Sequence, residues 1–552
     1  MTIAAYKSFS ARPVLRVGII IFAVLVTALC VLPYLAVLTA ALAGSFDTLA
    51  HLADTVLGRY IRDTLILVVI VMSGSAMLGV GAAWIVTMTE FPGRRWFEIA
   101  LAVPLAFPAY VLAYAYTHIL DHPGIVQATL RDMMGWGPRD YWFPEIRSLG
   151  GAAAMLILVL YPYVYLLARA SFSAQSGSAF LAARVLGRNP LQACIAVSLP
   201  MARPAIAAGI FLVAMETIAD FGTVSYFGVQ TFSVGIYTSW FAMADRAAAA
   251  QLSLGLLAFA LLLAMMERYN RGNAAYIDHQ RKAPMDRIRL GRSAQISVFL
   301  LCSIPVALGV VVPVVALTTM AIGSEQDLLS PRYLGFIRNS LTLASVAALV
   351  TVAAAIVLGT LHRVRQTRLT QMSLYLGRLG YAVPGGVIAV GLLVPFAIFD
   401  NALDEWMRAT FDISTGLLLT GSIWLLVAAY MIRFLAAAIG AYEGGIASVG
   451  PNIDAAARTL GADLPRLLRR VHVPILRTSL LTAGLIVFVD VMKELPATLI
   501  MRPFNYDTLA VQAHRLASDE RLNGAAVPSL VIAAIGLIPV ILLCRRMHRG
   551  VS

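Results

Sequence analysis

Apolar runs of about 20 residues or more make up most of this chain, and short polar stretches separate them. The hydrocarbon core of a bilayer is about 30 Å thick and is crossed by roughly 20 residues of helix. Twelve runs are long enough, which predicts an all-α membrane protein with about twelve transmembrane helices. The predicted spans are residues 16–43, 64–88, 97–120, 150–168, 204–228, 250–266, 294–321, 339–361, 372–399, 415–439, 478–501 and 525–544. Pro104, Pro108 and Pro384 are expected to kink or break their helices.

The polar segments between the runs predict an orientation. With the N-terminus in the cytoplasm, the outer loops hold 12 Lys and Arg but 17 Asp and Glu, while the inner segments are richer in Lys and Arg. Loops rich in Lys and Arg stay on the cytoplasmic side. We therefore expect a multi-pass protein of the bacterial cytoplasmic (inner) membrane with both termini in the cytoplasm.

Composition narrows the classes of function. Of 552 residues, 60% are hydrophobic and 13% are charged, whereas soluble domains carry about 25% charged residues. The net charge of +13 is attributed to loop orientation, so the lipid bilayer is expected as a partner and nucleic acid is not. The four cysteines lie far apart and mostly in apolar runs, which excludes a disulfide framework and a CxxC metal site.

The sequence repeats itself over half the chain. Residues 182–187, Ala-Ala-Arg-Val-Leu-Gly, match residues 456–461, Ala-Ala-Arg-Thr-Leu-Gly, at an offset of 274. Residues 62–65 and 102–104 match residues 338–341 and 382–384 at nearby offsets. Six helices return a chain to its starting side, so this repeat predicts two parallel six-helix halves, residues 1–271 and 272–552.

Each half contains one unusual cytoplasmic loop, at residues 181–200 and 455–474. The pattern predicts a short helix, a glycine turn, and a second short helix ended by proline. A plain basic anchor at the membrane surface is the alternative interpretation of the arginines. The repeated residues are Ala182, Ala183, Arg184, Gly187 and Pro200 in the first loop and Ala456, Ala457, Arg458, Gly461 and Pro474 in the second.

These loops resemble the EAA loop of ABC transporter permeases, E-A-A-x-x-x-G followed by a hydrophobic-x-Leu-Pro segment. The Glu of that motif is replaced by Leu181 in the first loop and by Ala455 in the second. The resemblance implies a fused pair of type I importer half-permeases. Its implied partners are two ABC ATPase subunits on the cytoplasmic side, which the loops contact, and an extracytoplasmic substrate-binding protein. None of the three lysines lies in a phosphate-loop motif, so we expect no cofactor and no ATPase activity in this chain, with ATP bound by the partner subunit.

The segments that follow the loops indicate a cargo. Residues 215–232 and 490–504 resemble the corresponding segments of ferric-iron permeases in this superfamily. The resemblance implies import of ferric iron delivered by the binding protein. Thiamine, aminoethylphosphonate and polyamines remain alternative cargoes, because their permeases are built on related plans. An ion-coupled secondary transporter and a non-transporting membrane scaffold are the alternatives from other classes.

Four acidic residues in two repeated pairs fall in or beside predicted spans: Glu216, Asp220, Asp490 and Glu494. A spacing of four places each pair on one helical face. An ionised side chain at mid-membrane costs about 2.5–3.5 kcal/mol on insertion scales, so each needs a partner or water. One interpretation is that they line a pathway between the halves for a cation such as Fe³⁺. The other is that they bind Lys493, backbone donors or hydroxyls such as Thr217 and Thr498, and lock helices together.

Overall fold

The computed structural model describes residues 13–45, 47–175, 177–271, 287–327, 329–364, 366–447 and 449–549. Eleven helices in these ranges are long and apolar enough to cross a membrane, and counting one bent pair of helices as a single span gives twelve. The prediction of an all-α membrane protein with about twelve spans is confirmed.

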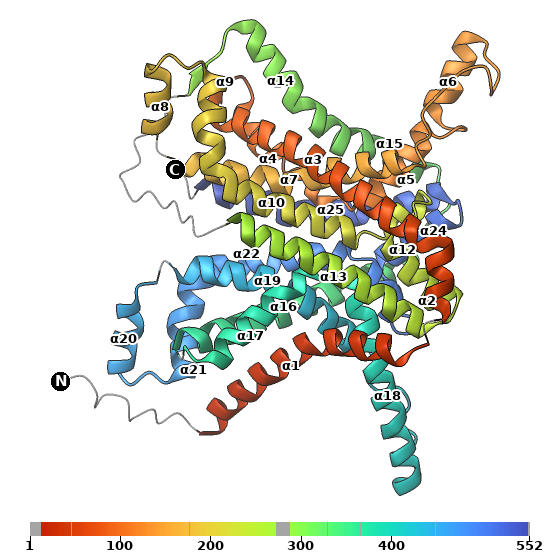
Figure 1. Ribbon diagram of the computed structural model, residues 1–552, viewed down its shortest axis with the longest axis vertical. Helices are drawn as coiled ribbons and strands as arrows, with labels where there is room; N and C mark the ends of the chain where they lie inside the picture. Colours follow the sequence, from red (N-terminus) through yellow and green to blue (C-terminus); the bar gives the residue numbers. More distant parts are fainter. Residues whose placement is uncertain are drawn as a thin grey trace. The chain divides into compact units, whose positions relative to one another are not determined.

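The chain forms two compact units (Figure 1), which we call unit 1, Met1–Gly44 with Ile337–Asp507, and unit 2, Ser45–Phe336 with Thr508–Ser552. The helices of unit 1 are α1 (Pro13–Ala43), α17 (Arg368–Leu379), α18 (Gly385–Phe411), α19 (Ile423–Ile446), α20 (Pro451–Thr459), α21 (Leu464–Leu467), α22 (Val473–Lys493) and α23 (Pro496–Met501). Helix α16 (Pro331–Val364) begins in unit 2 and continues into unit 1.

The helices of unit 2 come from three parts of the chain. They are α2 (Asp47–Leu52), α3 (Gly58–Met88), α4 (Arg94–Ala100), α5 (Ala109–Leu120), α6 (Ile125–Met134), α7 (Leu149–Ala174), α8 (Gly177–Val185), α9 (Pro190–Ala193), α10 (Leu199–Ala219), α11 (Gly222–Tyr226), α12 (Phe232–Tyr237), α13 (Arg246–Arg271), α14 (Arg292–Val306), α15 (Val312–Ile322), α24 (Leu509–Ser518) and α25 (Leu522–Arg549). The two-residue strands β1 (Thr89–Glu90) and β2 (Ile288–Arg289) pair in parallel.

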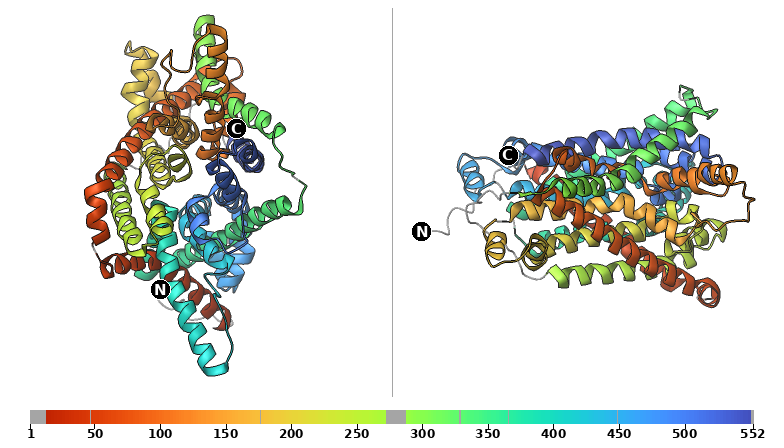
Figure 2. Two further views of the ribbon diagram at one scale, coloured as in Figure 1. Left: turned by 90° about the vertical axis from the view of Figure 1, so that its right-hand side faces the viewer. Right: turned by 90° about the horizontal axis from the view of Figure 1, so that it is seen from above.

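Long apolar helices pack along one another inside each unit. In unit 2, α3, α7 and α10 pack against one another, as Figures 1 and 2 show in orange to yellow, and α25 packs against α15 and α24. In unit 1, α1 packs on α18, and α19 packs on α22. Gly391 of α18 allows α1 to approach α18 closely, because a Cβ at this position would lie 2.6 Å from the carbonyl oxygen of Pro33 in α1.

The compact units and the repeated sequence divide the chain differently. Helix α1 belongs to the first half of the sequence but packs with helices of the second half, while α14, α15 and α25 of the second half belong to unit 2. The division into halves 1–271 and 272–552 therefore describes the repeat in the sequence and stays a prediction.

Prolines break two of the predicted spans. Helices Arg94–Ala106 and Ala109–Met134 are bent by 91°, so the predicted span 97–120 consists of two helices with a break between them. Pro104 lies in the first turn of a 3-10 segment, Val103–Ala106, and Pro108 is the N-cap of α5. The predicted span 372–399 is broken in the same way, since α17 ends before the 3-10 turn Gly380–Ala382 and Pro384 is the N-cap of α18. The predicted breaks at these prolines are confirmed.

Two further spans end earlier than their apolar runs. Helix α10 ends at Ala219, although the predicted span is 204–228, and α22 ends at Lys493, although the predicted span is 478–501. In both places an extended residue follows and a short new helix begins, α11 or α23. Each apolar run predicts a single helix because periodicity does not distinguish one long helix from two short ones.

Candidate functional site

The two repeated loops have the same backbone geometry, and we call residues 181–200 the first coupling loop and residues 455–474 the second. Helix α8 ends before Gly187, whose φ is +85°, and α20 ends before Gly461, whose φ is +79°. In each loop, the amide after the glycine bonds back to an alanine carbonyl: Arg188 to Ala183 over 3.2 Å and Ala462 to Ala457 over 2.9 Å. This is the Schellman motif, which needs a left-handed residue and so favours glycine.

The second short helix of each loop begins with a side-chain cap. Asn189 accepts a hydrogen bond from the amide of Gln192 at 2.8 Å, and Asp463 accepts one from the amide of Arg466 at 3.0 Å. These residues also correspond at the offset of 274. Short polar side chains at this position satisfy amides that have no partner within the helix.

The proline does not end the second short helix, which corrects the predicted form of the loops. In both copies the chain stays helical from α9 into α10 and from α21 into α22, through π-turns at Cys194–Ser198 and Leu468–His472. Pro200 and Pro474 follow these π-turns at the first positions of α10 and α22. A wider turn accommodates a proline that can neither donate a hydrogen bond nor pack as closely as other residues.

Each loop exposes a large apolar side chain just before its glycine. Leu186 is 82% exposed and Leu460, at the repeated position, is 87% exposed. Val185 and Leu181 of the first loop are exposed as well. Ala182 and Arg184 lie on the exposed side of α8, whereas Ala183 is buried beneath it; Ala456 is exposed while Ala457 and Arg458 are half-buried. The alanines and arginines of the loops were predicted from the sequence, but Leu186 and Leu460 were not. They could have been found as the last apolar residues before the glycine.

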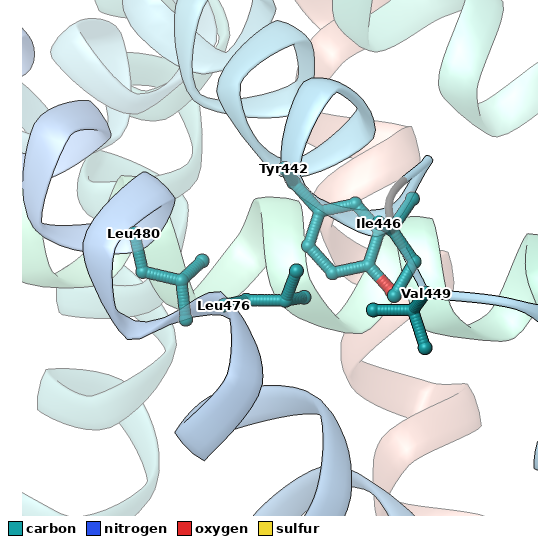
Figure 3. Close-up of a cluster of buried hydrophobic side chains, with 5 residues drawn as sticks. All are labelled: Tyr442, Ile446, Val449, Leu476 and Leu480. Atoms are coloured by element: carbon teal, nitrogen blue, oxygen red, sulfur yellow. The ribbon is translucent and has the colours of Figure 1, made fainter. Parts of the chain in front are cut away.

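The interior of the two loops differs. In the second, Nε2 of His472 lies 2.9 Å from Asp454, and Arg363 binds the other oxygen of Asp454 and the carbonyls of Ile446 and Val449. Ile446 and Val449, whose carbonyls Arg363 binds, belong to a cluster of buried apolar side chains. Figure 3 shows this cluster, which consists of Tyr442, Ile446, Val449, Leu476 and Leu480. At the position that repeats as Asp454, the first loop has the buried Phe180, which packs with Ala183 and Ala193.

The charged partners determine the ionisation of Asp454, which lies outside the membrane spans. Burial by itself would raise the pKa of this carboxyl, but hydrogen bonds from Arg363 and His472, together with their charges, lower it below the ordinary value. The second coupling loop is therefore held by an ionised carboxylate, and the first by apolar packing.

Two of the four membrane carboxylates cap the short helices that follow them. Asp220 accepts hydrogen bonds from the amides of Thr223 and Val224, both at 3.1 Å. Glu494 accepts them from the amides of Ala497 and Thr498 at 3.0 and 3.1 Å. Backbone donors and hydroxyls hold these carboxylates, as the locking interpretation predicts, because Thr223 and Thr498 also donate their hydroxyls. Thr217 donates to the carbonyl of Val213 instead.

The second pair of carboxylates has basic partners in unit 1. Lys493 lies 2.9 Å from Asp490, and Arg433 of α19 lies 3.3 Å from Glu494. Both members of the Arg433 pair are buried, with 9% and 2% of the side chains exposed. Gly385 leaves room for this pair, since a Cβ there would lie 2.4 Å from the guanidinium. The sequence analysis missed Arg433, which lies 61 residues from Glu494.

The first half has no basic residue at the corresponding positions. Arg433 and Lys493 repeat as Val159 and Ala219 at the offset of 274. Glu216 lies on α10, half-buried in unit 2. The two pairs therefore share their capping geometry but differ in local charge, and their place in a pathway stays a prediction.

An ion pair of reversed polarity ties each broken span to the helix before the coupling loop. In unit 2, Glu98 of α4 binds Arg169 of α7 at 2.9 Å and also pairs with Arg94. In unit 1, Arg378 of α17 pairs with Glu443 of α19. Glu98 repeats as Arg378 at the offset of 280 that relates Pro104 to Pro384, and Arg169 repeats as Glu443 at 274. The contact is kept while its charges are exchanged.

No group of three or more His, Cys, Asp or Glu side chains that could hold a metal ion occurs among the described residues. The four carboxylates are assembled in two pairs that belong to different units. What the arrangement offers chemically is a set of helix-capping carboxylates in the membrane and two rigid, exposed loops.

Comparison with known proteins gives relatives along nearly the whole chain, although no protein-family model matches. The Fe(3+)-transport system permease protein FbpB 2 of Haemophilus influenzae is 25% identical over 496 residues, covering 88% of this chain and 90% of the relative. The probable ABC transporter permease protein y4fN of Sinorhizobium fredii is 27% identical over 568 residues, covering 97% and 96%.

A third relative matches a shorter part of the chain. A putative 2-aminoethylphosphonate transport system permease protein, PhnU of Salmonella choleraesuis, is 26% identical over 216 residues, covering 38% of this chain and 73% of its own length. The predicted resemblance to ABC permeases, including those for ferric iron, is confirmed by these matches. A multi-pass membrane protein is likewise confirmed.

Proposed function

We propose, on the premise that this chain is a permease subunit of the ABC transporter type, that it imports ferric iron across the bacterial inner membrane. The observation that carries this proposal is the match over 88% of the chain to a permease named for Fe(3+) transport. The iron arrives on an extracytoplasmic binding protein, and both termini of the chain lie in the cytoplasm. These statements extend what the relatives have in common to this particular chain.

Two ATPase subunits supply the energy in this proposal. Each contacts one coupling loop, where Leu186 or Leu460 presents an exposed apolar side chain at the end of a rigid helix. Exposed apolar groups of this kind on a cytoplasmic loop favour a protein partner. The Schellman turns fix the direction of each helix, so that movement of a partner is transmitted to α10 and α22. ATP binds and is hydrolysed on the partners, and the permease itself catalyses no reaction and holds no cofactor.

The membrane carboxylates have two roles in the proposal. Asp220 and Glu494 hold the ends of α11 and α23 in place through hydrogen bonds to backbone amides. Glu216 and Asp490, one helical turn earlier, offer carboxylate oxygens to a passing cation, and Lys493, 2.9 Å from Asp490, must release that oxygen for the contact. Hard oxygen ligands suit Fe³⁺, and contact must be brief because tight binding would stop transport.

Uptake by the complete transporter tests the cargo and the carboxylates together. The permease, its ATPase and its binding protein are reconstituted in vesicles, and uptake of radioactive ferric iron is measured with ATP. The double variant Glu216→Gln, Asp490→Asn should abolish uptake but leave the amount of bound ATPase unchanged. Wild-type vesicles that accumulate no iron would disprove the cargo, and unchanged uptake in the double variant would disprove the role of the carboxylates.

The matched loop variants test the coupling proposal separately. Leu186→Ser with Leu460→Ser removes both exposed leucines while leaving the glycine turns in place. We expect the ATPase to be lost on purification while the permease keeps its thermal stability. Leu301→Ser, an exposed position on α14 away from both loops, is the control and should retain the ATPase.

Import of 2-aminoethylphosphonate is the second candidate. It is favoured by the relative named for that cargo, which matches 38% of this chain. Competition in the same vesicles distinguishes the two, because excess 2-aminoethylphosphonate would suppress uptake only if the transporter carried it.

A further inference from the structure

A small polar cavity lies wholly within unit 2, between the start of α16 and the end of α24. Its volume is about 140 Å³, and its lining includes Gln326, Arg332, Tyr333, Gln512, Arg515 and Arg521. We call it the arginine pocket. One water molecule occupies about 30 Å³ of liquid, so a small ion and a few waters fit inside. On the predicted topology the pocket opens to the outer side of the membrane.

The pocket carries positive charge. Three guanidinium groups line it, against one carboxylate, that of Asp519. Arg515 donates to the side-chain oxygen of Gln512 at 2.8 Å, which fixes one edge of its guanidinium. Within the described part of the chain, neither Arg332 nor Arg521 forms an ion pair, and Arg332 lies over the ring of Phe336 at 5.8 Å. The three arginines therefore produce a local excess of positive charge.

A buried hydroxyl at the pocket lacks a hydrogen-bond partner. Tyr333 lines the cavity and is only 2% exposed, and within the described residues its hydroxyl oxygen is bonded to no protein group. Its backbone amide is already satisfied by the hydroxyl of Ser330 at 3.3 Å. Buried hydroxyls in folded proteins almost always have a partner. The lining of the pocket therefore includes one hydroxyl whose hydrogen-bonding capacity no described protein group uses.

The repeat shows that the fold itself does not need these arginines. Arg515 and Arg521 correspond to Phe241 and Ala247 at the offset of 274, and Arg332 corresponds to Val56 at the offset of 276 that relates residues 62–65 to 338–341. Outer loops of membrane proteins are also depleted in Arg. Three arginines at one outer cavity are therefore unexpected, because the first half has no arginine at the matching positions and outer loops usually contain few. This indicates a function specific to the second half.

We propose that the arginine pocket is a binding site for a small free oxyanion, of the phosphate or carboxylate class. Guanidinium groups bind such anions with two parallel hydrogen bonds, and the hydroxyl of Tyr333 adds a neutral donor. Asp519 at the lining lowers the net positive charge of the site, which the three arginines still exceed. The site goes beyond the import of a cation and does not depend on it.

Binding to the purified full-length permease, without ATPase or binding protein, tests the proposal. Inorganic phosphate is titrated by calorimetry against sodium chloride of equal ionic strength, and thermal unfolding is recorded in both salts. Wild-type protein should bind one phosphate and unfold at a higher temperature in phosphate. Arg515→Gln and Arg521→Gln should each weaken binding about tenfold, because each removes a charged hydrogen bond.

Two further variants separate a specific site from general charge. Tyr333→Phe keeps the ring and its packing, and should weaken phosphate binding several-fold without lowering stability in chloride. Arg338→Gln removes one arginine from the same helix but not from the pocket lining, and should bind as wild type does. Absence of phosphate binding in the wild type would overturn the proposal, and so would equal loss in Arg338→Gln and Arg515→Gln. Because no iron is present, the outcome is independent of the proposed cargo.

Discussion

Individual residues in this chain owe their roles to partners that lie far away in the sequence. Asp454 joins His472 and Arg363, 18 and 91 residues away, in one buried network. Lys493 was foreseen as a partner of a membrane carboxylate, since it lies three positions from Asp490. Arg433 was not foreseen, because nothing local relates α19 to Glu494.

Replacing Asp454→Asn should destabilise the permease by about 1–3 kcal/mol, because charged hydrogen bonds from Arg363 and His472 are lost. Thermal unfolding in detergent at pH 7 measures the loss. Asp463→Asn removes the same charge from the same loop but keeps a capping oxygen, so it should change stability by less than about 0.5 kcal/mol. Equal losses in the two variants would refute a special role for Asp454.

The loss of stability in Asp454→Asn should depend on pH. The pKa of Asp454 is lowered from its ordinary value of 3.8 in the folded protein. Its stabilising effect is therefore complete above that value and is lost as the pH falls through the lower folded-state pKa. The difference in unfolding temperature between wild type and Asp454→Asn should stay constant from pH 7 to about pH 5 and shrink below pH 4. A difference that grew on acidification would contradict this sign.

At the scale of elements, the repeat preserves geometry more faithfully than chemistry. Both coupling loops use a Schellman turn, a side-chain cap, a π-turn and a proline. The glycine and proline could be recognised in the sequence because backbone geometry restricts those positions. The π-turns could not be recognised, since no residue type requires them.

The exchanged ion pairs allow a comparison between the two units. Glu98→Gln should destabilise the permease by about 3–5 kcal/mol, since it leaves Arg94 and Arg169 buried without their carboxylate. Arg378→Gln, the repeated position, should cost less than about 1 kcal/mol because that pair is exposed. Chemical denaturation of both variants in detergent measures the difference. If Arg378→Gln were the more harmful change, burial would not be the deciding factor.

For the whole molecule, the compact units and the repeated halves follow different boundaries. Unit 1 contains α1 from the first half and α17 to α23 from the second. The contact between Pro33 and Gly391 shows how closely α1 fits α18. A helix that leaves its own half to pack with the other ties the two halves together.

Separate expression of residues 1–271 and 272–552 tests this arrangement. Neither half should give a stable, monodisperse protein alone. The second half lacks α1 of unit 1, and the first half contains α1 but none of the other helices of unit 1. Expressed together, the halves should purify as one complex, through the contact of α1 with α18 in unit 1 and the contacts of α15 and α25 with α5 in unit 2. Replacing Gly391→Leu should lower the unfolding temperature of that complex, since the added side chain meets the backbone of Pro33, whereas Gly440→Leu on α19, where a Cβ meets nothing within 4 Å, should not. A stable second half on its own would disprove the prediction.

An all-α membrane protein of about twelve spans, its internal repeat, the glycine turns and the proline breaks could all be predicted from the sequence. These follow from apolar length, from backbone restrictions and from similarity within the chain, all of which are local or periodic. The folded arrangement was needed to show which helices form each unit, which carboxylates cap helices, and which arginines line one cavity. Such contacts join residues far apart in the chain, and packing of complementary surfaces selects them rather than any pattern along the sequence.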